Sequence, residues 1–336
     1  MLALSWLTPA SAGDLRHGAH HDPPPGGPYA VVVSGLRNPR GLDLSADGKL
    51  YVAEGGEAGD ACFDVPSPEG GGPTCGAVGP LQPRRSAHRH AHGLRHRALS
   101  LGGPLFAIGP TGVAVKGNQV YGLMGANDKA LPPLGSCVSG DCAAALAAAQ
   151  AQLGHLLRGV PSGGYQRKQD VGALNYDWTV ANKATIGAGD PAYQDGWKDN
   201  PDFQPGDANP YGLADAPGGT YMVDGGSNTL TWVPQNGAPR VVAALPQPVD
   251  VAKPNAYDAV PTCVAPSGRS VVVADLNGRV FVVDGTSLTV QAASLTSPDG
   301  AHLVAAGGCA ADGKGNVYIS DIFAGSLVKV SCGRWR

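Results

Sequence analysis

The stretch NPYGLADAPGGTYMVD, residues 209–224, decides the fold of this chain. A short apolar segment leads into a turn rich in Pro and Gly, and a second segment rich in β-forming residues ends on an acid. Glycine tolerates the positive φ angle that a tight hairpin requires. The stretch therefore predicts a β-hairpin.

The same pattern occurs four more times along the chain. Each copy has a short apolar strand, a turn with Gly or Asn and a second strand rich in Val and Tyr; the copies occupy residues 38–54, 109–124, 260–275 and 307–321. Another pair of strands follows the hairpin, as in GGSNTLTWV followed by APRVVAAL. Five units of this kind are recognisable.

The spacing of the units is typical of propeller repeats, which recur about every 40–50 residues. Asp224 and Asp275 are 51 residues apart, and Asp275 and Asp321 are 46 apart. A blade cannot cover its own two faces, so blades pack around a channel. We predict an all-β propeller of four-stranded blades, of the six-bladed type; either one unit is degenerate or truncated, or the ring has five blades. Residues 29–33 are expected to close the ring beside residues 326–330.

The composition agrees with many short strands in one large domain. Gly and Pro number 50 and 29 of 336 residues, and charged residues make up only 15%. The net charge of the chain is −3. The window 79–103 holds five Arg and no acidic residue, so the rest of the chain has 19 basic and 27 acidic residues and a net charge of −8. An acidic body argues against a nucleic-acid partner. No apolar run reaches the length of a membrane span.

The N-terminus predicts export. Residues 1–12, MLALSWLTPASA, resemble the end of a secretory signal with an A-x-A cleavage site. We expect residues 1–28 to be a signal-like segment and flexible lead-in, and residues 29–332 to form a single propeller domain. The protein is therefore expected to be a secreted or periplasmic monomer.

Seven cysteines fit an oxidising compartment. Cys62 and Cys75 bracket one Gly- and Pro-rich loop, and Cys137 and Cys142 bracket another short loop, so each pair is predicted to form a disulfide. The pairing of the others stays open; they are Cys263, Cys309 and Cys332.

Two insertions interrupt the repeat. Residues 126–157 contain a predicted short helix with an apolar stripe that includes Leu153, Leu156 and Leu157. Residues 175–207 are rich in Asp, Asn, Pro and Trp without a clear strand, and are expected to cover one face of the ring as a loop.

The second strand of most units ends on an acid: Glu54, Asp224, Asp275 and Asp321. A ring of carboxylates at the channel mouth could hold Ca²⁺ or place a general base near a metal-bound water. Alternatively, each acid caps the adjoining turn through backbone N–H groups. Asn38 and Asn209 start the inner strands in the same region, as ligands or as shapers of the Asn-Pro turn. No cofactor is certain from the sequence, and Ca²⁺ is the cation this pattern would suit.

Taken in order, several motifs resemble the ScyD/ScyE family, exported β-propeller proteins named for a scytonemin biosynthesis cluster. The resemblance covers about residues 30–330 except one window, and rests on SGLRNPRGL, YVAEGGEAGDACF, IGPTGVAV, GHLLRGV, DVGALNYDWT, DANPYGLADAPGG and AVPTCVAPSG. It implies a propeller fold and export. It supplies no catalytic residues to carry over.

The window 79–103 departs from this pattern. Residues 84–97 contain no Val, Ile, Tyr, Phe or Thr, a composition that is not expected to form the apolar face of a buried strand. Three interpretations remain open: translation of a GC-rich gene in a shifted frame, a genuine surface loop, and a metal or polyanion site. In the last, three imidazoles would share one face of a strand, those of His88, His90 and His92.

These observations favour a binding function. The expected ligand is a small molecule, a glycan or a protein partner on the insertion-bearing face of the propeller. The alternative is a metal-dependent hydrolase of the lactonase or esterase type that uses the carboxylate ring. The sequence contains neither G-x-S-x-G nor H-E-x-x-H, so it offers no motif for a nucleophile or a zinc protease.

Overall fold

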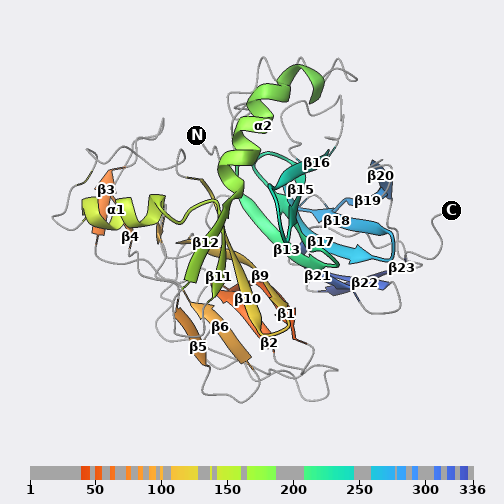
Figure 1. The fold of residues 1–336 in the computed structure, drawn as a ribbon, viewed down its shortest axis with the longest axis horizontal. Helices are drawn as coiled ribbons and strands as arrows, with labels where there is room; N and C mark the ends of the chain where they lie inside the picture. Colours follow the sequence, from red (N-terminus) through yellow and green to blue (C-terminus); the bar gives the residue numbers. More distant parts are fainter. Residues whose placement is uncertain are drawn as a thin grey trace, which may run out of the picture.

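The computed structural model describes residues 39–45, 50–54, 61–64, 73–76, 82–85, 91–95, 99–100, 107–127, 137, 142–159, 165–186, 208–245, 259–276, 278–284, 290–293, 306–311, 316–321 and 326–331. Within these residues the chain forms six small sheets and two helices (Figure 1). The predicted signal-like segment, residues 1–28, and the predicted closing strand, residues 29–33, lie outside them.

Five of the sheets correspond to the five units recognised in the sequence, and we number them as blades 1 to 5. In chain order their strands are as follows: blade 1, β1 (Pro39–Leu44), β2 (Leu50–Glu54), β5 (Gln82–Arg85) and β6 (Ala91–Arg95); blade 2, β9 (Pro110–Lys116), β10 (Gln119–Met124), β11 (His155–Gly159) and β12 (Tyr165–Asp170); blade 3, β13 (Pro210–Ala216), β14 (Gly219–Asp224), β15 (Thr229–Pro234) and β16 (Arg240–Ala244); blade 4, β17 (Pro261–Ser267), β18 (Ser270–Asp275), β19 (Val280–Asp284) and β20 (Val290–Ala293); blade 5, β21 (Ala306–Ala311), β22 (Asn316–Asp321) and β23 (Ser326–Ser331).

The first strand of each blade forms the inner wall of a closed ring. β1 contacts β9, β9 contacts β13, β13 contacts β17, β17 contacts β21, and β21 returns to contact β1. The all-β propeller of four-stranded blades predicted from the sequence is confirmed. The sixth sheet contains β3 (Ala61–Asp64), β4 (Pro73–Gly76), β7 (Leu99–Ser100) and β8 (Ala107–Ile108), and it lies to one side beside helix α1 (Cys142–Gln150) (Figure 1).

Both faces of a blade are buried, and this explains the continuous apolar runs of the second strands. Successive side chains of a strand point to opposite faces, so Met222 packs toward blade 2 while Val223 packs toward blade 4. In the next blade, Val273 packs back toward blade 3 and Val272 forward toward blade 5. The core is therefore a series of apolar layers between blades.

Glycine at the third position of the inner strand lets neighbouring blades approach closely. A Cβ atom on Gly41 would lie 2.8 Å from the Gly112 Cα, and one on Gly112 would lie 2.9 Å from the Leu213 Cβ. A Cβ atom on Gly212 would lie 2.8 Å from the Thr262 carbonyl oxygen. Three successive junctions of the ring thus depend on a missing side chain.

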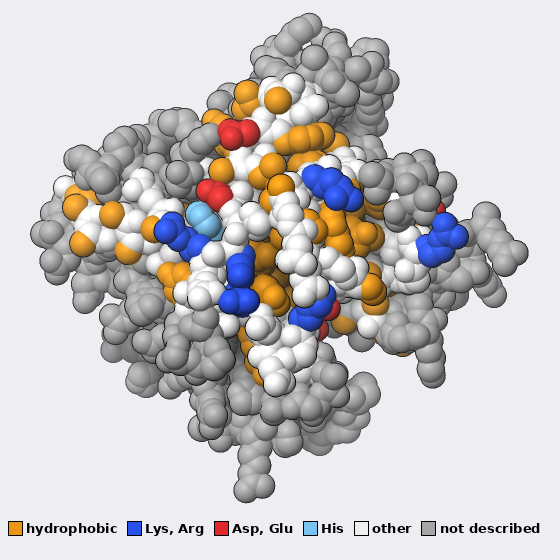
Figure 2. Space-filling model, in the orientation of Figure 1, with side chains coloured by type: hydrophobic (Ala, Val, Ile, Leu, Met, Phe, Trp, Pro, Cys, Tyr) orange, Lys and Arg blue, Asp and Glu red, His pale blue; other side chains and the backbone are white. Residues whose placement is uncertain are grey.

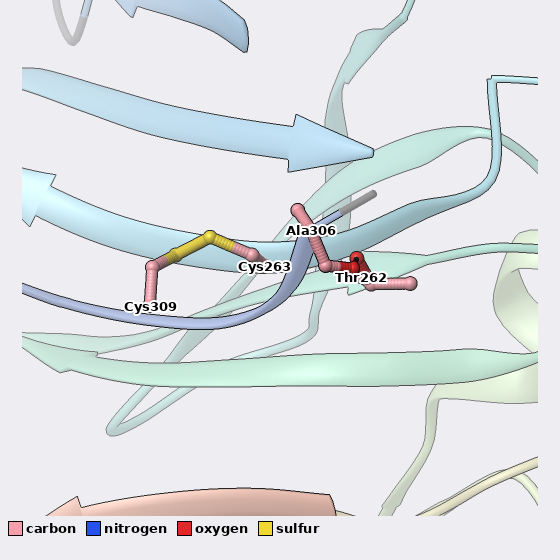
Figure 3. The surroundings of a disulfide bond; sticks show 4 residues. All are labelled: Thr262, Cys263, Ala306 and Cys309. Atoms are coloured by element: carbon pink, nitrogen blue, oxygen red, sulfur yellow. Dashed lines mark hydrogen bonds between the residues drawn. A yellow bond between two sulfur atoms is a disulfide. The ribbon is translucent and has the colours of Figure 1, made fainter. Parts of the chain in front are cut away.

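At the next junction a disulfide takes the place of the glycine. Cys263 of β17, which is 1% exposed, bonds to Cys309 of β21 with 5.3 Å between the Cα atoms (Figure 3). Beside it, the Thr262 hydroxyl donates a hydrogen bond to the carbonyl oxygen of Ala306, the first residue of β21. The structure thereby settles a pairing that the sequence left open and joins blades 4 and 5 covalently.

The insertions differ from their sequence-based description. Helix α1 ends at Gln150, and Leu156 and Leu157 belong to β11, where they are buried as members of blade 2 rather than of a helical stripe. The segment predicted as a loop begins instead with a helix, α2 (Val171–Ile186). The prediction missed α2 because the apolar residues of VGALNYDWTVANKATI are spread around the helix and do not form one clear apolar stripe. None of the helices among the described residues is long and apolar enough to cross a membrane.

The His/Arg-rich window contributes two strands to blade 1, although its composition is not that expected for the apolar face of a buried strand. β5 pairs antiparallel with β6, and β6 pairs with β2. The β2–β6 pair is parallel, whereas the other strand pairs that the structure describes are antiparallel. Backbone hydrogen bonding, which does not depend on side-chain type, allows strands to form from residues of this composition.

We predict that Gly112→Ala lowers the free energy of unfolding by about 1–3 kcal/mol, because the added methyl group would overpack the junction of blades 2 and 3. Gly159→Ala is the matched control, since its Cβ would meet its nearest neighbour, the Val120 carbonyl oxygen, at 3.4 Å. Urea denaturation measures both variants. Equal stability of the two would contradict a close-packed ring.

The Cys263→Ala/Cys309→Ala double variant is expected to lose about 2–4 kcal/mol of stability, since the disulfide closes a loop with a sequence separation of 46 residues. Guanidinium denaturation of both proteins without reductant provides the measurement. An unchanged midpoint would show that the bond contributes nothing to the closed ring.

Candidate functional site

Both insertions leave the propeller at the same end of the blades. The connection between the second and third strands of blade 2 contains α1, and the connection from blade 2 to blade 3 contains α2. Because the first and second strands of each blade are antiparallel, the second strand ends where the first strand begins, and this is the end from which the insertions leave. Figure 1 shows α2 projecting from the ends of β12 and β13. We call this end the insertion-bearing face; the opposite end carries tight turns such as residues 117–118 and 217–218.

The four acids singled out in the sequence also lie at this face. In each blade the last residue of the second strand pairs with the first residue of the inner strand, and a register shift follows; the pairs are Pro39 with Glu54, Pro110 with Met124, Pro210 with Asp224, Pro261 with Asp275, and Ala306 with Asp321. The position is thus equivalent in all five blades, although blade 2 has Met in place of an acid.

Asp224 is fully buried and surrounded by hydrogen-bond donors. Its Oδ1 accepts hydrogen bonds from the backbone N–H groups of Asn209 at 2.7 Å, Gly226 at 3.0 Å and Ser227 at 2.9 Å. Its Oδ2 accepts a hydrogen bond from Asn175 Nδ2 at 2.9 Å. A buried carboxylate with four donors is a structural cap whose lone pairs face protein rather than a ligand.

Asp275 has a similar environment in blade 4. It is fully buried, its Oδ1 accepts a hydrogen bond from the backbone N–H of Arg279 at 2.9 Å, and its Oδ2 lies 2.6 Å from the Arg279 guanidinium. The same guanidinium lies over the Phe281 ring, 5.2 Å from its centroid. Asp275 therefore caps its own turn and forms an ion pair with it.

Turn length explains where Asp occurs. The second and third strands are joined by four residues in blades 3, 4 and 5, and these are the blades that carry Asp224, Asp275 and Asp321. Blades 1 and 2 have longer connections and carry Glu54 and Met124 instead. This correlation favours capping of a four-residue turn over a carboxylate ring that binds a cation.

Helix α2 is fixed to blade 3 by a buried amide. Asn175 has no exposed surface; its Nδ2 donates to Asp224, and its Oδ1 accepts a hydrogen bond from Thr231 Oγ1 at 2.8 Å. The Thr179 hydroxyl donates to the Asn175 carbonyl oxygen at 2.7 Å, one turn along the helix. Sequence reasoning missed Asn175, because it lies 49 residues before Asp224 and no local pattern marks the contact.

Asn209 joins the two insertions at their bases. Its Oδ1 accepts a hydrogen bond from the backbone N–H of Ala126 at 2.8 Å, and Ala126 is a buried non-glycine residue with φ of 59°. Asn127, the next residue, donates to the Ala208 carbonyl oxygen at 2.8 Å. Asn209 thus shapes the chain between blades 2 and 3, and the strained conformation of Ala126 is held by its surroundings.

The remaining predicted residues are only partly described. Glu54 ends β2 and is 6% exposed. Asp321 ends β22, but its side chain is not among those described. Asn38 lies outside the described residues. His88 and His90 also lie outside it, and His92 is paired with Tyr51 through the backbone of β6. Among the described side chains, no group of three His, Cys, Asp or Glu is close enough to hold a metal ion.

Backbone pairing of two strands places the cysteines of the first predicted disulfide opposite each other. Cys62 and Cys75 are register partners in β3 and β4. Cys137 is disulfide-bonded, and its partner lies beyond the described side chains. The Cys62–Cys75 and Cys137–Cys142 bonds therefore stay predictions.

Comparison with known proteins yields similar structures but no family. No family model matches the chain, and no curated protein matches it. The chain is similar to a catalytically inactive virginiamycin B lyase from Staphylococcus aureus with quinupristin, at 11% identity and a TM-score of 0.42, covering 90% of this chain and 73% of that one. It is also similar to a chain of a nidogen/laminin complex, at 13% identity and a TM-score of 0.43, covering 87% and 75%.

A third similar structure is a putative 6-phosphogluconolactonase from Bacteroides uniformis, at 14% identity and a TM-score of 0.38, covering 88% of this chain and 72% of that one. The functions of these proteins differ from one another. Similarities at this level carry no argument about the activity of this chain.

Asn175→Ala is expected to lower the free energy of unfolding by about 1–3 kcal/mol, because it leaves Asp224 and Thr231 with buried polar atoms that lose a partner. Hydrogen exchange should speed up first in α2. Asn182→Ala is the control, since among the described residues that amide donates to the Trp178 carbonyl oxygen of its own helix and not to a blade. If both variants behave alike, Asn175 does not anchor the helix.

Proposed function

We propose that the chain is an exported β-propeller that binds a small molecule, a glycan or a protein on its insertion-bearing face, without catalysis. The observation that carries this proposal is the asymmetry of the molecule. Both long insertions emerge at one end, and α2 is held there by the Asn175–Asp224–Thr231 hydrogen bonds. A rigid scaffold that supports irregular segments at one end is the usual arrangement of a binding site.

The exposed side of α2 offers the contact surface. Val180 is 50% exposed and is the one large apolar side chain so exposed among the described residues. Asp177 and Ala181 are also exposed. An apolar group beside a carboxylate suits a ligand that combines apolar and polar parts.

The Cys263–Cys309 disulfide supports the proposed export, because such bonds persist in oxidising compartments. The protein is proposed to act as a secreted or periplasmic monomer of the ScyD/ScyE type.

A lactonase-like hydrolase remains the alternative proposal, and it requires a bound divalent ion. Its carboxylate ring is less well supported, because Asp224 and Asp275 are engaged by backbone, Asn175 and Arg279 donors. A Ca²⁺ ion would have to displace those donors to gain the oxygen ligands it needs.

A thermal-shift screen of small molecules together with a glycan array tests the binding proposal. Ligands found in this way are expected to lose about tenfold or more in affinity for Asp177→Arg/Val180→Glu. They should bind normally to Gln235→Ala/Asn236→Ala, which changes an exposed turn at the opposite end. Ligands that respond only to the turn variant would overturn the choice of face.

Turnover of ester and lactone substrates before and after EDTA tests the alternative. The binding proposal expects no turnover that depends on a divalent ion and no change in the unfolding temperature with chelator. Chelator-sensitive hydrolysis would replace the proposed function with the hydrolase.

A further inference from the structure

The outer strands of blade 2 carry a concentration of positive charge that the binding proposal does not use. β11 and β12 contain Arg158, Arg167 and Lys168 but only one acid, Asp170. Figure 2 shows Lys and Arg side chains gathered over these strands, beside a His. The whole chain has a net charge of −3, so this strip differs in sign from the average of the molecule.

Among the described residues, the partners that orient Arg158 are side-chain amides and not carboxylates. One guanidinium nitrogen lies 2.6 Å from Gln166 Oε1 and another lies 3.5 Å from Gln119 Oε1. Tyr121, Arg158 and Gln166 are register partners on three adjacent strands, so their side chains share one face of the sheet. The guanidinium is thereby held in place by neutral groups.

Arg167 and Lys168 are exposed on the edge strand; Arg167 is the register partner of Leu157 and so lies on the opposite face of the sheet from Arg158 and Gln166, with the edge of the blade between them. Arg167 donates one hydrogen bond, of 3.2 Å, to the Ala151 carbonyl oxygen, and Lys168 has no partner in the part of the chain that the structure describes. A register shift between Leu156 and Leu157 places Lys168 in a β-bulge opposite them. A bulge commonly re-aims a side chain at a sheet edge.

The single acid of the strip is already engaged. Asp170 Oδ1 accepts the backbone N–H of Ala173 at 2.9 Å at the start of α2, and its Oδ2 lies 3.7 Å from His155 Nε2. Burial raises the pKa of the Tyr165 phenol despite the opposing effect of Arg167, so this tyrosine adds no negative charge at neutral pH. Three cations and one carboxylate therefore leave β11 and β12 with a net charge of +2, and the carboxylate is held at the start of α2.

The exposed side chains around these three cations favour a hydrophilic partner. A protein interface usually contains apolar or aromatic anchors, and a lipid surface requires apolar insertion; the large side chains exposed on β11 and β12 are polar. Arginine forks match carboxylates, and Gln side chains hydrogen-bond hydroxyl groups. We propose that Arg158, Arg167 and Lys168, with Gln119 and Gln166, bind a carboxylate-bearing polysaccharide along the outer edge of blade 2.

This site is distinct from the ligand site proposed on α2. It lies along the outer strands of one blade, and Arg158 is near the end of β11 that points away from the insertion-bearing face. The two proposals can therefore fail separately.

Binding of the full-length protein to polygalacturonate, with neutral dextran as control, tests the proposal at low and at physiological salt. Arg167→Gln/Lys168→Gln is expected to weaken binding about five- to tenfold, and Arg158→Gln by a similar factor, because each removes charge-assisted contacts. Two variants that also remove two charges serve as controls: Arg240→Gln/Arg269→Gln on blades 3 and 4, and Arg84→Gln/Arg85→Gln on β5. Both are expected to change affinity less than about twofold.

Several outcomes would overturn the proposal. Equal losses in all of the double variants would indicate general charge attraction, and a loss confined to Arg84→Gln/Arg85→Gln would place the site in the His/Arg-rich window. Tighter binding to single-stranded DNA or to anionic vesicles than to polygalacturonate would assign a different partner. Absence of polygalacturonate binding at low salt would exclude the site, whatever α2 binds. Thermal unfolding of each variant confirms that the fold is intact.

Discussion

The propeller depends on how closely the inner strands of neighbouring blades approach one another. Gly41, Gly112 and Gly212 leave no room for a Cβ atom at three junctions, and Cys263 bonds to Cys309 at the fourth. Close approach brings the apolar faces of adjacent sheets together, and each face is buried only because the next blade covers it. The glycine repeated at the third position of the inner strands therefore allows the apolar layers between blades to form.

The same repeat determines how the insertion-bearing face is built. Asp224 and Asp275 close four-residue turns by accepting backbone hydrogen bonds, so these blades end compactly at this face. Blade 2 has Met124 at this position and continues into an insertion. Asn175 then uses the buried Asp224 as an attachment point for α2. A residue that caps one blade thus positions the irregular segment supplied by another.

The fold could be predicted because it is encoded locally and repeated. Alternating apolar residues and Gly-containing turns around residues 209–224 specify hairpins, and the repeat specifies how they pack. The Asn175–Asp224 contact and the Cys263–Cys309 bond could not be predicted, since they join residues 49 and 46 positions apart with no local signal. The strand at Ala91–Arg95 was missed because it forms through backbone pairing with β2, and backbone groups carry no compositional signature.

Chain continuity and the disulfide together distinguish the junctions of the ring. Blades 4 and 5 are joined both by chain continuity and by a covalent cross-link, whereas β21 and β1 meet only through non-covalent contacts between the two ends of the described chain. Any partial opening of the circle is therefore directed to that seam, and the opened molecule would be an arc in which the last blade stays fastened to its predecessor. The Cys263–Cys309 bond thus keeps the last blade attached to blade 4 when contact with blade 1 is lost.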